Sequence, residues 1–187
     1  MSLAQKYRKS LDQRCSMRFK TRHPDGDNYD GVVIHLAKSF IVIREVRDFD
    51  FDGIVVLPKR MVVRCRDGKY EACYNQILRM NLAIARLRVP RWLARCETIV
   101  DVLQNLMEHR IWPGVEILYG HPEKDAFYLG PIENVSRKTV GLKSYDAAGK
   151  WENTYSLEVA EIFRIEFDSN YCNHFNKYMQ QSREPDE

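Results

Sequence analysis

The chain repeats one order of helix and strands twice, and this repetition constrains the fold more than any other feature. In each half an amphipathic helix comes first, short alternating strands follow, and a second helical stripe ends the half. We favour an ancient duplication over chance similarity between two β-rich segments. The corresponding pairs are Gly31 and Gly130, Lys38 and Arg137, Ile41 and Val140, Asp67 and Asp168, and Tyr70 and Tyr171.

In the first half, apolar residues four apart predict a short amphipathic helix over residues 3–15. Alternation of apolar and polar residues then predicts strands, and the period changes again to a helical stripe that stops before Pro90, which a helix interior excludes. The predicted strands are 17–22, 31–36, 40–46, 54–57 and 60–66, and the helical stripe covers 69–87.

The second half follows the same order. Thr98 is suited to begin a helix that ends before Pro113 and Gly114. Five strands and a closing helix follow, and the polar tail 182–187 is expected to be disordered. The predicted strands are 115–119, 126–135, 139–145, 151–157 and 161–167, and the helix is 170–181.

These elements predict an α+β, mainly β chain built as two tandem small five-stranded barrels, each flanked by an N-terminal and a C-terminal helix. The expected domains are residues 1–90 and 91–187. The chain resembles the Sm-like family and, more loosely, the SH3-like barrels, in the paired segments 31–36 and 40–46, 130–135 and 139–145, and in the closing segment 157–165. The resemblance implies barrels that close on themselves and hide their edges, and it favours RNA binding or protein assembly. The family's nucleotide-binding signatures are not recognisable, so none of its base-binding residues is carried over.

Charge divides unevenly between the halves. Residues 1–96 hold 20 Lys and Arg against 10 Asp and Glu, whereas residues 97–187 hold 9 against 16, which gives +10 and −7 for a total of +3. A basic first half suggests a polyanionic partner, or pairing between unlike halves.

The first barrel carries the main candidate site. Alternation places Met17, Phe19 and Thr21 on the inner face of the first strand, and Met61, Val63 and Cys65 on that of the last strand. Since the resemblance implies that these strands are neighbours, six cations would share one outer face. Like charges repel each other there, and a bound anion would relieve the repulsion. The alternative is a solvated face whose acids come from elsewhere. The six cations are Arg18, Lys20, Arg22, Arg60, Arg64 and Arg66.

The segment between the halves is the second candidate. Residues 79–96 contain five arginines and no acidic residue. Arg91 and Arg95 lie four apart with Trp92 between them, so a cation row beside a stacking ring could bind RNA. The alternative is a connector whose arginines pair with acids of the second half and whose Trp92 belongs to the core.

Catalysis finds little support. The histidines are scattered, and Cys172 and His174, which are two residues apart, diverge on a helix. Neither a metal-binding spacing nor a glycine-rich phosphate loop is present. The run Asp48 to Gly53 starts like a calcium loop, but Lys59 stands where the bidentate Glu belongs, so we interpret it as a turn. We therefore expect no enzyme, catalytic residue, metal or cofactor.

Location and partners are also constrained. The chain lacks an apolar run of the ~20 residues that cross a bilayer and an apolar leader, so we expect a cytoplasmic protein that does not bind membranes. Five cysteines without a framework indicate a reducing compartment with mostly buried thiols. The leading function is binding of RNA or another polyanion. The alternative is a protein-interaction module, in which the basic half binds an acidic protein surface or the acidic half of another copy, so that a homo-oligomer forms through unlike halves.

Overall fold

In the computed structural model the described residues are 1–23, 28–81, 83–118 and 127–182. The chain divides into two compact units, Met1–Thr98 and Ile99–Glu187. The described elements are helices and a larger share of strands, so the α+β, mainly β class is confirmed. The division falls after Thr98, and residues 91–98, which we expected to begin the second domain, therefore belong to the first unit.

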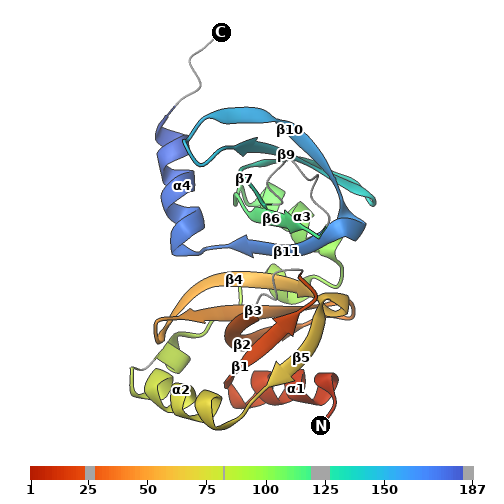
Figure 1. Ribbon diagram of the computed structural model, residues 1–187. Helices are drawn as coiled ribbons and strands as arrows, with labels where there is room; N and C mark the ends of the chain where they lie inside the picture. The colour runs from red at the N-terminus through yellow and green to blue at the C-terminus, as the bar shows by residue number, and fades with distance from the viewer. Residues whose placement is uncertain (24–27, 82, 119–126, 183–187) are drawn as a thin grey trace. The chain divides into compact units, whose positions relative to one another are not determined.

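The first unit consists of one antiparallel sheet with helices before and after it (Figure 1). Its strands follow the order β5-β1-β2-β3-β4. The strands are β1 (Ser16–Thr21), β2 (Asn28–Leu36), β3 (Phe40–Arg47), β4 (Asp50–Pro58) and β5 (Val62–Arg66); the helices are α1 (Leu3–Gln13) and α2 (Lys69–Met80), with the 3-10 turns η1 (Lys59–Met61), η2 (Ala83–Arg86) and η3 (Leu93–Arg95).

This sheet is not a closed barrel, which corrects the expectation drawn from the resemblance. Among the strands of this unit, β4 pairs with β3 and β5 pairs with β1, and β4 and β5 are not neighbours in the strand order. The expected contact of the first and last strands is present, because β1 pairs with both β2 and β5. Closure depends on how far the sheet curls, and strand alternation does not report curvature.

The helix α1 is joined to the sheet through a buried serine. Its N-terminus is set by a capping box, in which the Ser2 hydroxyl accepts from the Gln5 amide at 3.3 Å and the Gln5 side chain accepts from the Ser2 amide at 2.7 Å. The Ser10 hydroxyl donates to the Cys15 carbonyl at 2.7 Å and accepts from the Val33 amide of β2 at 2.9 Å. Ser10 is fully buried, so these bonds satisfy groups that water cannot reach.

The helix α2 is shorter than the apolar spacing suggested. We expected it to continue to residue 87, but it ends at Met80 and the chain turns at Asn81. Ile84 beyond the turn packs on the cluster of Val46 and Leu78. The apolar pattern therefore continues because the segment after the helix covers the same core, and the pattern does not report the turn.

The second unit contains two antiparallel sheets rather than one five-stranded barrel. Their strand orders are β11-β6-β7 and β10-β9-β8. The elements are α3 (Ile99–Glu108), β6 (Gly114–Ile117), β7 (Phe127–Leu129), β8 (Ile132–Val135), β9 (Thr139–Tyr145), β10 (Trp151–Glu158), η4 (Val159–Glu161), β11 (Ile162–Phe167) and α4 (Asn170–Gln181). Residues 119 and 126, which we expected in strands, and 183–187 of the expected disordered tail lie outside the described residues.

Gly130 divides the single strand that we expected over residues 126–135. It has φ +153°, and a Cβ there would lie 2.0 Å from the Lys143 carbonyl oxygen of β9. In the first unit a Cβ on Gly31 of β2 would lie 2.6 Å from the Arg44 carbonyl oxygen of β3. The two glycines that the sequence aligns therefore occupy equivalent places, where a side chain would separate neighbouring strands.

Membrane insertion through helices has no support in the described ranges. None of the helices there combines the length and the hydropathy that a bilayer crossing requires.

Candidate nucleic-acid interface

The strands β1 and β5 bring four of the predicted cations side by side. In their antiparallel register Arg18 is opposite Arg66, and Lys20 is opposite Arg64. The inner face follows the expected alternation on β1, where Met17 and Phe19 are fully buried.

The other two cations lie at the ends of these strands rather than within them. Arg22 follows β1, and its amide donates to the Met61 carbonyl at 2.9 Å, which places it beside η1. Arg60 belongs to η1, and burial lowers the pKa of its guanidinium. Six cations thus occur near the same pair of strands, but only four form opposed pairs.

The expected alternation on β5 is wrong at Val63, whose side chain is 43% exposed instead of buried. The register between β1 and β5 shifts between Lys20 and Thr21, so that Thr21 is opposite Val62 and Val63 is an extra residue. An extra residue in one strand is a β-bulge, which turns the following side chains relative to the alternation. Arg64 nevertheless faces outward, and Cys65 is buried.

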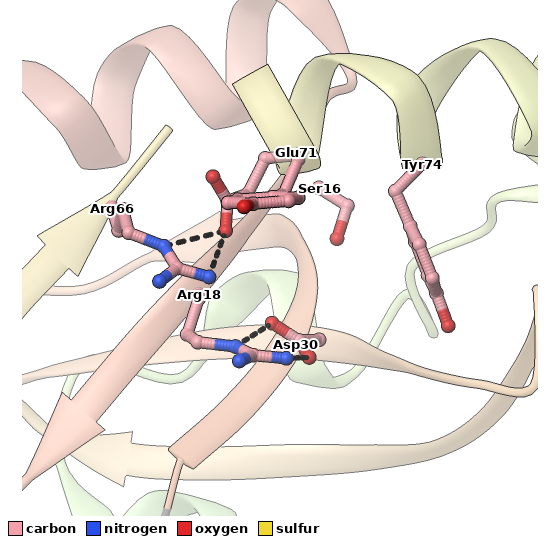
Figure 2. Close-up of a pocket in the computed structure, with 7 residues that line it drawn as sticks. Ser16, Arg18, Asp30, Arg66, Glu71 and Tyr74 are labelled. Atoms are coloured by element: carbon pink, nitrogen blue, oxygen red, sulfur yellow. Dashed lines mark hydrogen bonds and ion pairs between the residues drawn. The ribbon is translucent and has the colours of Figure 1, made fainter. Parts of the chain in front are cut away.

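Two of the four opposed cations are held by carboxylates of the same unit. Arg18 donates from Nε to Asp30 Oδ1 at 2.8 Å, and this hydrogen bond raises the pKa of Arg18. Arg66 donates from Nε to Glu71 Oε1 at 2.7 Å. Burial alone would raise the pKa of Glu71, but the hydrogen bonds from Arg66 and from the Gly68 amide hold it below its usual range. Figure 2 shows both guanidinium groups against their carboxylates.

Lys20 and Arg64 differ from this arrangement. Both side chains are exposed, and within the described ranges neither forms an ion pair with an acidic residue. Like charges directly opposite each other on neighbouring strands destabilise a sheet. Acids from elsewhere in the unit thus compensate two of the four opposed cations, as the alternative interpretation held, and Lys20 and Arg64 have no acidic partner among the described residues.

The second unit has the opposite arrangement at the equivalent place. Arg164 of β11 is opposite Glu116 of β6 in the same antiparallel pairing, and the two form an ion pair. Arg164 Nη1 also lies 3.1 Å from Glu166 Oε2. The position of Lys20 in the first unit is thus occupied by an acid in the second, so the two units differ in charge where their strands correspond.

A pocket adjoins the cations of the first unit. It has a volume of about 340 Å³ and lies where α2 crosses the outer side of β1, β2 and β5. Asn75 joins α2 to β1 at this place, because its side chain accepts a hydrogen bond from the Ser16 amide at 2.6 Å and donates one to the Ser16 carbonyl at 3.0 Å. The lining residues are Ser16, Arg18, Asp30, Arg66, Tyr70, Glu71 and Tyr74 (Figure 2).

The sequence interpretation missed this pocket. Asp30 is the direct cross-strand neighbour of Arg18, which a register between β1 and β2 would have revealed. Glu71 is the third residue of α2 and binds the Gly68 amide, a common sequence pattern at the start of a helix. Tyr70 and Tyr74 lie within the predicted helical stripe 69–87, which does not distinguish an exposed ring from a buried one, and Tyr70 is 67% exposed.

The arginine-rich segment belongs to the first unit. Arg91 and Arg95 are exposed, while Trp92 is half-buried and Leu93 is fully buried, so part of the segment is core as the alternative proposed. The Cys96 carbonyl lies 3.1 Å from His35 Nε2 of β2. These contacts attach the segment to the first unit's sheet, in agreement with the division of the chain after Thr98.

The aspartate-rich run forms a turn only in part, because Asp50–Gly53 belong to β4. Asp48 and Phe49 have φ of 46° and 65° and join β3 to β4 between the paired residues Arg47 and Asp50. Asp52 Oδ2 lies 3.6 Å from Arg47 Nε, so this carboxylate forms an ion pair within the hairpin. No group of three or more His, Cys, Asp or Glu among the described residues is placed to hold a metal ion.

Two of the buried thiols, those of Cys65 and Cys172, are poorly suited to nucleophilic chemistry. Burial raises the pKa of Cys65 to about 12 and that of Cys172 to about 11. A thiol with so high a pKa remains protonated near neutrality and is a weak nucleophile. This argument covers Cys172, the residue whose neighbour His174 drew attention in the sequence.

Comparison with known proteins adds no identity, because no family model, no curated protein and no solved structure matches this chain.

Proposed function

We propose that the first unit binds RNA through the outer face of β1 and β5, in a fold of the Sm-like or SH3-like kind. The observation that carries the proposal is the opposed pair Lys20 and Arg64, two exposed cations on neighbouring strands. A phosphate between them would replace mutual repulsion by two favourable contacts and release counterions. The fold part of the proposal is supported by α1 before the sheet and by the neighbouring first and last strands.

The contrast with the second unit also supports the proposal. At the equivalent position an ion pair between Glu116 and Arg164 satisfies both charges within the fold. A sheet can therefore carry a compensated pair at this place, whereas the described pair Lys20 and Arg64 of the first unit is uncompensated. A functional requirement for positive charge explains why a less stable arrangement occupies one unit.

The test is a fluorescence anisotropy titration of the whole chain with a labelled single-stranded RNA over a range of salt. The slope of log K against log salt is expected to fall by about 0.7 in Lys20→Gln, the value of one phosphate contact on a single strand. Lys20→Glu is expected to weaken binding roughly tenfold at low salt, since it adds repulsion.

The matched control is Lys38→Glu, which makes the same change of net charge in the same unit. Lys38 lies in the turn between β2 and β3, while Lys20 pairs with Asn28 at the opposite end of β2. We expect less than a twofold effect from the control. Absence of binding by the wild type at about 50 mM salt, where phosphate contacts are strong, would contradict the proposal. Equal effects of the two substitutions would contradict the assigned face.

A second candidate is a protein-interaction module. β5 stands at the end of the first unit's sheet, and Val63 on it is exposed beside the cations. An exposed strand edge with an apolar side chain is a template for pairing with another chain, and an acidic surface would suit its charge. Light scattering over a range of salt separates this candidate from RNA binding, because self-association of unlike halves must weaken as salt rises.

A further inference from the structure

The pocket beside the cation pair contains a polar group with no assigned use. Ser16 is only 3% exposed, and among the described residues its hydroxyl forms no hydrogen bond. Figure 2 shows this hydroxyl directed into the pocket, between Glu71 and Tyr74. A hydroxyl that is directed into a pocket can donate a hydrogen bond to a ligand there or accept one from it.

Aromatic rings from α2 form the wall of the same pocket. Tyr70 is 67% exposed, and its ring centroid lies 5.1 Å from Lys69 Nζ and 5.9 Å from Arg66 Cζ. Tyr74 is fixed, because its ring lies 4.5 Å from that of Phe49 and its hydroxyl accepts the Phe49 amide at 3.3 Å. An exposed ring with cations beside it can stack a base while the cations bind the neighbouring phosphate.

We propose that this pocket holds one unpaired base that bears an exocyclic amino group, and so selects single-stranded RNA containing cytosine, adenine or guanine over uracil. The proposal rests on the proposed function, which supplies the phosphate contacts. The carboxylates of Asp30 and Glu71 each bind one arginine and keep further acceptor positions, which an amino group can use. Uracil would present carbonyl oxygens to these acids instead. The volume of about 340 Å³ is at the small end for ligand pockets and suits a single base.

The experiment compares three probes on the whole chain: 12-residue oligocytidylate, 12-residue oligouridylate and inorganic polyphosphate. The two RNAs carry the same backbone and differ at the base in an amino group against a carbonyl oxygen. We expect the wild type to bind oligocytidylate roughly tenfold more tightly than oligouridylate, the effect of one good base contact.

Tyr70→Ala is expected to weaken the binding of oligocytidylate roughly tenfold, because it removes one ring on which a base stacks. The affinity for polyphosphate should not change. Tyr70→Phe should keep the affinity, since stacking needs only the ring. The control is Tyr171→Ala at the corresponding position of α4, since Tyr171 is 45% exposed in the second unit. This substitution should leave the affinity for oligocytidylate unchanged.

Equal affinity for the two RNAs, or an unchanged affinity in Tyr70→Ala, overturns the base pocket. In those cases polyphosphate and RNA still bind, and the proposed function survives. If the wild type binds none of the three probes at low salt, the proposed function itself fails, and that outcome differs from the other two.

Discussion

The substitution Lys20→Glu should stabilise the fold while it weakens RNA binding. It would place an acid opposite Arg64, which reproduces in the first unit the pairing of Glu116 with Arg164 in the second. Two like charges opposite each other on neighbouring strands lower the stability of the fold by about 0.2–1 kcal/mol, and two opposite charges raise it by a similar amount. Lys20→Glu removes the repulsion and adds an ion pair, so the free energy of unfolding should rise by about 1 kcal/mol at this exposed site. For a chain of this size, that change raises Tm by about 2–4 °C.

Differential scanning calorimetry at low and high salt measures this effect. Lys20→Gln removes only the repulsion, so its increase in Tm should be about half that of Lys20→Glu. Both increases should shrink at ~0.5 M salt, where the Debye length falls below ~5 Å. The reverse control is Glu116→Lys, which leaves Arg164 opposite a cation at a position only 7% exposed, and should cost about 3 kcal/mol. A lowered or unchanged Tm for Lys20→Glu at low salt would refute the view that the two cations repel each other uncompensated.

Three further substitutions test the scaffold, with urea unfolding as the measurement throughout. Ser10→Ala should lower the free energy of unfolding by about 2 kcal/mol, because it leaves the Val33 amide without its buried acceptor; a loss below about 0.5 kcal/mol would count against this bond. Gly130→Ala should cost about 2–3 kcal/mol, since the added Cβ would meet the Lys143 carbonyl oxygen at 2.0 Å, and a neutral result would show that the strands can separate freely. For Asp67 the hydrogen bond from Lys9 lowers the pKa in the folded state, so its contribution is present above the unfolded pKa of about 3.9 and is lost as the pH falls through the lower folded value. Asp67→Asn should therefore cost a few tenths of a kcal/mol at pH 7 and nothing near pH 2, and an equal cost at both values would exclude the ion pair as the cause.

The sequence determined the parts of this fold that depend on local patterns. The strand over 139–145 and the helix over 170–181 have the predicted bounds, because alternation and helical spacing report the buried face directly. The inner and outer residues of the strand that begins near Met17 follow for the same reason. The alternation of inner and outer residues does not hold at the Val63 bulge, because a residue is extra only relative to the partner strand.

The tertiary structure decided which charges are compensated. Arg18 and Lys20 are equivalent in the alternation, yet only Arg18 has an acid opposite it, because register brings Asp30 to that place. The pocket likewise requires α2 to cross the sheet, and no local pattern encodes that crossing. Side-chain periodicity is a property of neighbouring residues in one segment, whereas charge pairing and pockets depend on the distances between segments that only the folded chain fixes.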